Sequence, residues 1–220
     1  MKAVLFDLDG TLHDRGATLR GWLAGHVERH ALPAGYAERF TELDDFGYRS
    51  KREVLPQLVR ELALPHDPEV LWADFSEHSL AAPVPMPHAL DILRELRARG
   101  VRVGVVTNGW VEAQTACLER TGLLPLVDDV VISKSVGLSK PDPAIYTLAL
   151  ARLGVSGADA WFVGDSPRND VWGPQQVGLK AAYLPTGHGL KGERPDAVLR
   201  DLRDVLTLMD DAKPVLTAES

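Results

Sequence analysis

The chain has 220 residues and a formal net charge of −7, which argues against broad charge-driven binding to nucleic acid or to an anionic membrane. Its apolar runs are far shorter than the roughly 20 residues of a membrane span, and we expect no signal peptide. The single cysteine, Cys117, excludes an internal disulfide and is typical of a reducing compartment, so we expect a cytoplasmic protein.

Short β-rich runs alternate with helical segments along most of the chain. The predicted strands are AVLFDLD (3–9), VRVGVVTN (101–108), VDDVVIS (127–133), AWFVGDS (160–166) and LKAAYLP (179–185). Runs that are apolar on both faces and separated by helices predict a parallel sheet covered on both sides. The expected fold class is therefore α/β, a three-layer α/β/α Rossmann-like parallel sheet.

The helices between these strands have readable ends. One begins with Pro87 and stops at Gly100, and its apolar spacing predicts a buried stripe. The stripe consists of Leu90, Leu93 and Leu96. Another helix begins with Ser166 as its N-cap, followed by a proline at the first helical position.

Residues 14–84 break the alternation, because they carry helical patterns and no convincing strand. A stretch of this length cannot be a simple loop within a compact domain. We therefore predict a Rossmann-like core of residues 1–13 and 85–220, and a small helical-bundle cap domain of residues 14–84 that packs over the carboxyl end of the first strand. Pro56 should kink or split the third helix of the cap.

Two carboxylates, Asp7 and Asp9, interrupt the first apolar strand two residues apart, so strand geometry sends both toward the same side. Neighbouring carboxylates repel each other, and a metal cation is the obvious candidate to relieve that repulsion. Taken alone, the pair could instead cap a strand-to-helix turn.

Further polar residues fall at the ends of the other predicted strands, where ligands of an open parallel α/β sheet bind. They are Thr107, Asn108 and Gly109 after the second strand, Lys140 in KPDP, and Asp165 and Asp170 in GDSPRND. Each group alone has an ordinary explanation as a turn, a solvated loop lysine or a helix cap. Together they predict one acidic cluster with a lysine and a hydroxyl.

Four strings in this order make the chain similar to the haloacid dehalogenase superfamily of phosphotransferases. They are FDLDGTL, VVTNG, SKPDP and VGDSPRND, and the resemblance covers essentially the whole chain. The helical insert resembles the α-helical cap that one phosphatase branch of this superfamily carries after its first strand. The resemblance implies a hydrolase, specifically a Mg²⁺-dependent phosphatase.

The residue types suit that chemistry. Asp7 is a suitable nucleophile toward phosphorus, and Asp9 can serve as general acid and then as general base. Mg²⁺ prefers oxygen ligands, which the carboxylates of Asp7 and Asp165 supply together with a backbone carbonyl. The resemblance assigns that carbonyl to Asp9.

The remaining candidates would bind phosphate or orient the other groups. Thr107 offers a hydroxyl, the chain at Asn108 and Gly109 offers backbone N–H donors, and Lys140 supplies a fixed positive charge. We expect Asp170 to orient Lys140 or a metal-bound water rather than bind the metal. Thr11 is expected to stabilise the turn after Asp9.

The predicted function is Mg²⁺-dependent hydrolysis of a small phosphorylated metabolite through an aspartyl-phosphate. A sugar phosphomutase is the first alternative, although Thr11 is a mild argument for hydrolysis. A haloacid dehalogenase is disfavoured by Asp9, Asp165 and Asp170, and a non-catalytic binding module by the intact set of core groups. We expect a small-molecule partner and neither nucleic acid nor membrane. A monomer is the default, with a homodimer left open.

Three features outside this cluster are expected to have no part in the chemistry or only a minor one. His26 and His30 lie four residues apart and are expected on a solvated surface rather than at a metal. The glycine-rich stretch 186–192 is expected to be a flexible connection. A small basic group is usually solvated but could reach a substrate anion; it consists of Arg49, Lys51 and Arg52.

Overall fold

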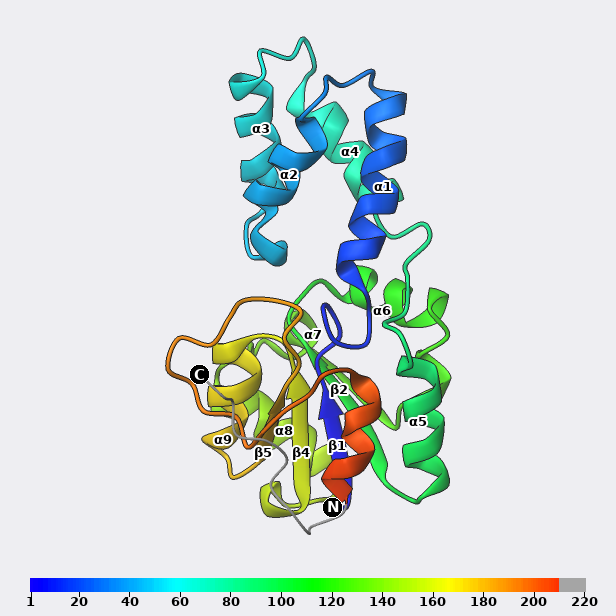
Figure 1. Ribbon diagram of the computed structural model, residues 1–220, viewed down its shortest axis with the longest axis vertical. Coiled ribbons are helices and arrows are strands. Elements are labelled where there is room, and N and C mark those ends of the chain that lie inside the picture. The colour runs from blue at the N-terminus through cyan, green and yellow to red at the C-terminus, as the bar shows by residue number, and fades with distance from the viewer. Residues whose placement is uncertain (210–220) are drawn as a thin grey trace. The chain divides into compact units, whose positions relative to one another are not determined.

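The computed structural model describes residues 1–209 of the chain. They divide into two compact units: a core unit, Met1–Asp14 with the chain from Pro85 onward, and a helical unit, Arg15–Val84 (Figure 1). Within residues 1–209, no helix combines the length and the apolar character that crossing a membrane requires.

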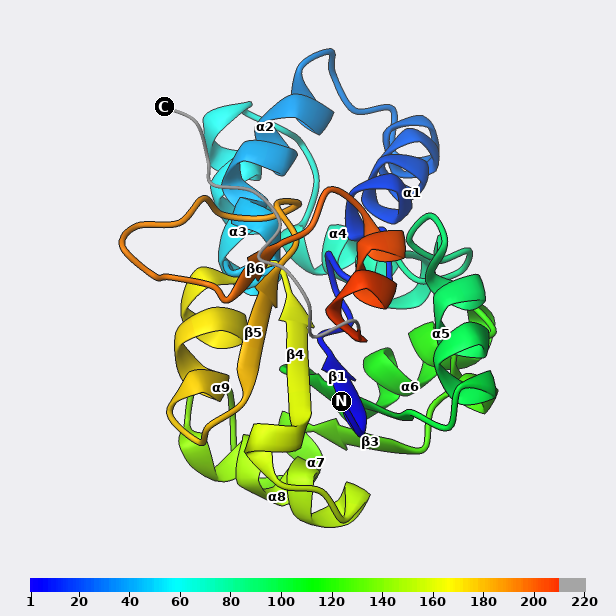
Figure 2. The same cartoon turned by 60° about the horizontal axis from the view of Figure 1, so that its bottom comes forward.

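The core unit is built on one parallel sheet of six strands in the order β3-β2-β1-β4-β5-β6. The strands are β1 (Ala3–Phe6), β2 (Arg102–Thr107), β3 (Asp129–Ile132), β4 (Ala160–Gly164), β5 (Lys180–Tyr183) and β6 (Ala197–Val198). This order confirms the predicted Rossmann-like α/β fold, and Figure 2 shows β4 between β1 and β5. The short edge strand β6 was not predicted, because two residues carry no measurable periodicity.

Helices cover both faces of the sheet. They are α5 (Ala89–Ala98), α6 (Val111–Arg120), α7 (Ser133–Val136), α8 (Pro143–Leu153) and α9 (Gly173–Gln175), with the 3₁₀ helices η2 (Leu124–Leu126), η3 (Gly157–Asp159) and η5 (Leu202–Met209) and the π-helical η4 (Pro167–Trp172). Alternate residues of β1 point to opposite faces. Leu5 packs in the hydrophobic cluster that α8 covers. Asp7 lies two residues after Leu5, so the strand alternation directs its side chain to the same face of the sheet.

Two predicted helix ends can be compared with the structure. Helix α5 begins at Ala89 rather than at Pro87. Its buried stripe includes Leu93 and Leu96 as predicted, but Leu90 is only half-buried. Ser166 is the predicted N-cap, because its hydroxyl accepts a hydrogen bond from the N–H of Asn169, and a π-helical segment, η4, starts after it.

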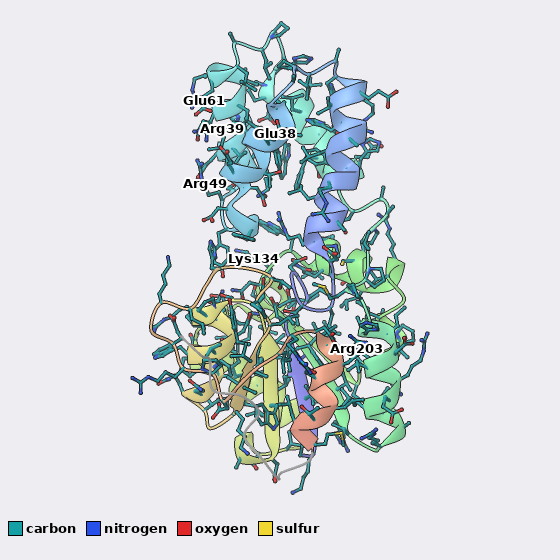
Figure 3. All side chains as sticks on the ribbon, viewed as in Figure 1. Glu38, Arg39, Arg49, Glu61, Lys134 and Arg203 are labelled. Carbon is teal, nitrogen blue, oxygen red and sulfur yellow. The ribbon has the colours of Figure 1, made fainter. Side chains whose placement is uncertain are left out.

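The helical unit consists of α1 (Arg15–Arg29), α2 (Tyr36–Asp44), η1 (Asp45–Gly47), α3 (Lys51–Glu61) and α4 (Pro68–His78). These helices enclose a core of their own around Trp22 and Phe40. Arg39 of α2 pairs with Glu61 of α3 on the surface, with Nε and Oε2 2.8 Å apart (Figure 3).

Helix α3 runs unbroken through Pro56, so the predicted split is wrong, while the alternative of a kink stays a prediction. Pro56 lies in the second turn, where its missing N–H costs one bond close to the start of the helix. Leu55 and Leu58, on either side of it, are fully buried and hold the helix against its neighbours.

A polar network inside the helical unit joins α1 to α4. The carboxylate of Asp74 accepts hydrogen bonds from Trp22 Nε1 (3.0 Å), His26 Nδ1 (2.7 Å) and Arg29 Nε (2.6 Å). His26 is fully buried, and its Nε2 lies 3.2 Å from Tyr36 Oη. The expected solvated position is therefore wrong for His26.

The basic group of the helical unit is engaged in pairs. Lys51 is buried, with Nζ 2.5 Å from Asp44 Oδ1, and Arg15 binds the same carboxylate at 2.6 Å. Arg52 pairs with Glu69. Lys51 is thus a structural residue rather than the solvated one expected.

Candidate active site

The loop after β1 brings its two carboxylates to the carboxyl end of a central strand. Asp7 follows β1 directly, and its N–H donates to Val163 O of β4 at 2.9 Å. The N–H groups of Leu12 and His13 both donate to Leu8 O, at 3.0 and 2.9 Å, and close a tight turn. Backbone bonds therefore hold this turn.

Thr11 is part of the same turn, but its side chain does not perform the predicted task through a hydrogen bond. Its N–H donates to Leu8 O at 3.2 Å. Its hydroxyl is buried and has no hydrogen-bond partner among residues 1–209. Any stabilisation by Thr11 comes from its backbone and its packing.

Two glycines let the chain close around Asp165. Gly10 has φ +81°, and a Cβ there would lie 2.2 Å from Asp165 Oδ2. A Cβ at Gly187 would lie 2.4 Å from the same oxygen, and Thr186 Oγ1 donates to Gly10 O. Thr186 and Gly187 therefore lie against the site, and the expectation that the stretch 186–192 is a flexible connection stays a prediction.

Lys140 lies between two of the acids. Its Nζ is 2.7 Å from Asp7 Oδ1 and 2.8 Å from Asp170 Oδ1, and all three residues are buried. Asp170 Oδ2 accepts a hydrogen bond from the N–H of Ser166 at 2.9 Å. Asp170 thus contacts Lys140, and its role in orienting the lysine stays a prediction.

Three carboxylates crowd this site. Asp7, Asp165 and Asp170 each offer an oxygen, and these atoms lie within 4.8 Å of one another. Burial raises the pKa of Asp7 to about 7, with Lys140 opposing and Asp170 reinforcing the rise. Burial, followed by the charges of Asp7 and Asp170, raises the pKa of Asp165 to about 8. Against its own burial, the charges of Asp170 and Asp7 raise the pKa of Lys140.

The excess of carboxylates suits a divalent cation. One lysine faces three acids: burial raises the pKa values of Asp7 and Asp165, the charge of Asp170 adds to the rise, and Lys140 only partly offsets it. An all-oxygen set of carboxylates is what Mg²⁺ prefers. Both oxygens of Asp170 are engaged, Oδ1 by Lys140 and Oδ2 by Ser166, whereas Lys140 contacts only Oδ1 of Asp7, so Asp7 and Asp165 are the better-placed ligands.

The second predicted motif supplies the hydroxyl of Thr107 and an asparagine side chain that hydrogen-bonds the backbone of Lys140. Thr107 ends β2 and is buried. The side-chain amide of Asn108 is occupied by the backbone of Lys140: Oδ1 accepts from Lys140 N at 2.9 Å and Nδ2 donates to Lys140 O at 3.0 Å. The N–H of Gly109 donates to Ser133 Oγ at 3.0 Å. The Asn108 side chain therefore positions Lys140, and substrate binding by Asn108 stays a prediction for its backbone.

Asp9 has partners that sequence reasoning missed. Its Oδ1 lies 2.7 Å from His13 Nδ1, and its Oδ2 accepts a hydrogen bond from Gln114 Nε2 at 3.0 Å. His13 stands next to the first motif, which was a usable signal. Gln114 lies inside α6, and nothing in the helical pattern of that segment indicates a contact with Asp9.

Comparison with known proteins gives a consistent family. A profile of the haloacid dehalogenase-like hydrolases matches residues 1–178. A glyceraldehyde 3-phosphate phosphatase from Methanopyrus kandleri is 30% identical over an alignment of 203 residues, covering 85% of this chain and 85% of its own. A phosphoserine phosphatase from Thermus thermophilus is 33% identical over 196 residues, covering 82% of this chain and 74% of its own.

Solved structures share the fold. The magnesium-bound HAD hydrolase YfnB from Bacillus subtilis superposes with a TM-score of 0.79 at 22% identity, covering 95% of this chain and 98% of its own. The L-2-haloacid dehalogenase from Xanthobacter autotrophicus superposes with a TM-score of 0.75 at 21% identity, covering 97% and 100%. At these identities the likeness concerns the fold alone.

Proposed function

This chain belongs to the haloacid dehalogenase-like hydrolases and is a phosphoric monoester hydrolase, and we propose that it hydrolyses a small phosphorylated metabolite with Mg²⁺ through an aspartyl-phosphate. The observation that carries the proposal is the buried contact of Asp7 with Lys140, 2.7 Å long, beside Asp165 and Asp170. The family's named phosphatase relatives act on small phosphorylated metabolites, which supports that substrate class.

In the first step, an oxygen of Asp7 attacks phosphorus and the bond to the leaving oxygen breaks. The proton on Asp9 passes to that leaving oxygen, which departs as an alcohol. In the second step, Asp9 removes a proton from water as the water attacks the aspartyl-phosphate, so that inorganic phosphate and free Asp7 result. Asp9 is therefore deprotonated after the first step, as a general base must be, and protonated again after the second, ready to act as the general acid of the next turnover.

The other groups stabilise charge. Lys140 supplies a fixed positive charge beside Asp7, and Asp170 holds its ammonium in place. The hydroxyl of Thr107 would donate to a phosphate oxygen. Asp7, Asp165 and the Asp9 carbonyl would hold Mg²⁺, which supplies charge neutralisation for the phosphoryl group when bound. The helical unit would act as the cap that selects the substrate, and the assembly would be monomeric.

A phosphomutase remains the principal rival, because a β-phosphoglucomutase from Thermotoga maritima shares the fold at a TM-score of 0.78 and 21% identity, covering 97% of this chain and 100% of its own. The two functions differ in the acceptor of the phosphoryl group. Dehalogenation is disfavoured, since Asp9, Asp165 and Asp170 would have no task in it.

A substrate screen tests the proposal. Purified protein is incubated with p-nitrophenyl phosphate and with a panel of phosphorylated metabolites that includes glyceraldehyde 3-phosphate and phosphoserine, with Mg²⁺ or with a chelator. We expect release of inorganic phosphate that requires Mg²⁺ and is lost in Asp7→Asn. Transfer of phosphate to a second sugar hydroxyl would favour a mutase. No phosphate release from any compound of the panel would favour a non-catalytic binding module.

A further inference from the structure

Both oxygens of Asp9 are held, and the two holding groups come from different elements of the core unit. His13 Nδ1 lies 2.7 Å from Oδ1, in the turn after β1, and Gln114 Nε2 lies 3.0 Å from Oδ2, from α6. His13 is 1% exposed and Gln114 is 7% exposed, whereas the Asp9 side chain is 33% exposed. The carboxylate proposed to transfer protons is thus partly exposed to solvent and is also hydrogen-bonded by two buried side chains.

The two holding groups are themselves fixed. The N–H of His13 donates to Leu8 O at 2.9 Å, and its carbonyl accepts from the N–H of Gly10 at 2.9 Å. Gln114 Nε2 also donates to Asn108 O at 3.3 Å, which ties Asp9 to the loop after β2. Neither side chain is a mobile surface group, so each defines a position for the carboxylate.

This arrangement constrains the proton that Asp9 handles. A carboxylate has about four lone-pair sites. Hydrogen bonds to both oxygens fix the plane of the group and so the directions of its lone pairs. A general acid must hold its proton within hydrogen-bond reach of the leaving oxygen, and small misplacements of catalytic groups are costly.

We propose that His13 and Gln114 are positioning residues that orient the Asp9 carboxylate for proton transfer. The inference rests on the proposed function, since it presumes that Asp9 is the general acid and base. It adds two residues that neither the four motifs nor the acid cluster includes.

The experiment uses the dependence of the rate on the leaving group. p-Nitrophenolate departs with little help from an acid, whereas an alkoxide needs its proton. His13→Phe removes the ring nitrogen and keeps much of the volume, while His13→Asn places an amide nitrogen near the position of Nδ1. Gln114→Met removes the second donor at nearly constant length, and Gln176→Met, on an exposed glutamine of the core unit, is the matched control.

For an alkyl phosphate such as glycerol 3-phosphate, we expect His13→Phe and Gln114→Met to lower kcat about 10- to 100-fold with little change in KM, part of the 10²- to 10⁴-fold that a general acid contributes. The burst of p-nitrophenolate from p-nitrophenyl phosphate should slow less than about threefold. His13→Asn should recover most of the alkyl-phosphate rate, and Gln176→Met should match the unmodified protein.

Equal losses for both substrates, or an Asn variant as slow as the Phe variant, would overturn the proposal and make His13 a packing residue. If His13→Phe does not fold, as judged by its thermal unfolding, Gln114→Met decides alone by the same comparison. Asp7→Asn runs in parallel: retained turnover there would defeat the proposed function itself, separately from the role of His13 and Gln114.

Discussion

Each unit of the molecule buries a cluster built around aspartate, and the two clusters have opposite electrostatic balances. In the core unit, Asp7, Asp165 and Asp170 share one lysine, and the pKa values of Asp7 and Asp165 are raised. In the helical unit, one carboxylate, Asp74, faces Trp22, His26 and Arg29, and although burial opposes it, Arg29 and His26 hold the pKa of Asp74 well below its usual range.

Both clusters contain three side chains that could ligate a metal, so geometry alone does not separate them. His26, His30 and Asp74 meet the same distance criterion as the three acids of the core unit. The donors separate them: Asp74 accepts hydrogen bonds from several N–H groups and is balanced by the Arg29 guanidinium, whereas the three core acids share a single lysine. A buried polar cluster that is satisfied stabilises the fold, and one that is not satisfied is ready for a ligand.

The largest expected effect is on activity. Asp7→Asn should lower turnover more than about 10³-fold, in the range seen when other catalytic nucleophiles are removed. Asp74→Asn should leave kcat within about threefold, because its network is structural. Phosphate release, measured with both variants folded at the assay temperature, checks this contrast. An Asp74 variant that is fully folded but inactive would contradict a purely structural role for the Asp74 cluster.

The reverse contrast is expected in stability. Asp74→Asn leaves Arg29 and His26 facing a neutral amide, and we expect a loss of about 3 kcal/mol in the free energy of unfolding. Asp91→Asn is the control, since Asp91 is exposed and pairs with Arg94 at 3.1 Å on the surface. That pair should be worth less than about 1 kcal/mol. Urea titration of both variants measures the difference, and equal losses would contradict it.

Mg²⁺ should stabilise the protein in a pH-dependent way. The pKa values of Asp7 and Asp165 are raised from 3.8 to about 7 and about 8. Between the ordinary and the raised values the folded protein holds more protons than the unfolded chain, so without metal its stability falls as the pH rises. Mg²⁺ must displace these protons, and its effect on Tm should be larger at about pH 8 than at about pH 5.5. A shift independent of pH would argue against these ligands.

The smallest expected effect concerns His26. Burial lowers its pKa from the ordinary 6.5, against the opposing influence of Asp74. As the pH falls below that ordinary value, His26 becomes protonated in the unfolded chain but stays neutral in the folded protein, so the stability decreases. The slope should not exceed about 1.4 kcal/mol per pH unit. Urea unfolding at successive pH values, with His26→Gln as the comparison, isolates this contribution; an equal slope in both proteins would assign it elsewhere.

The sequence predicted the fold and the acid cluster because both depend on local patterns. Apolar runs identify the strands, and parallel strands bring their carboxyl ends to one edge of the sheet. The partners of Asp9 were harder to predict, because Gln114 reaches it across 105 positions of the chain. The burial of His26 did have a signal: it lies four residues after Trp22, on the stripe that α1 buries.

The two chain segments that connect the units run side by side within the core unit. His13 pairs with Pro85 in an antiparallel bridge, and the N–H of Met86 donates to Leu12 O at 2.8 Å. Arg15–Val84 therefore leaves the core unit and returns to it at one junction. An insertion with adjacent ends can be lengthened, shortened or exchanged without repacking its host. If the helical unit selects the substrate and Asp7 is the nucleophile, as proposed, substrate preference can change in evolution by exchange of this unit while the chemistry stays constant.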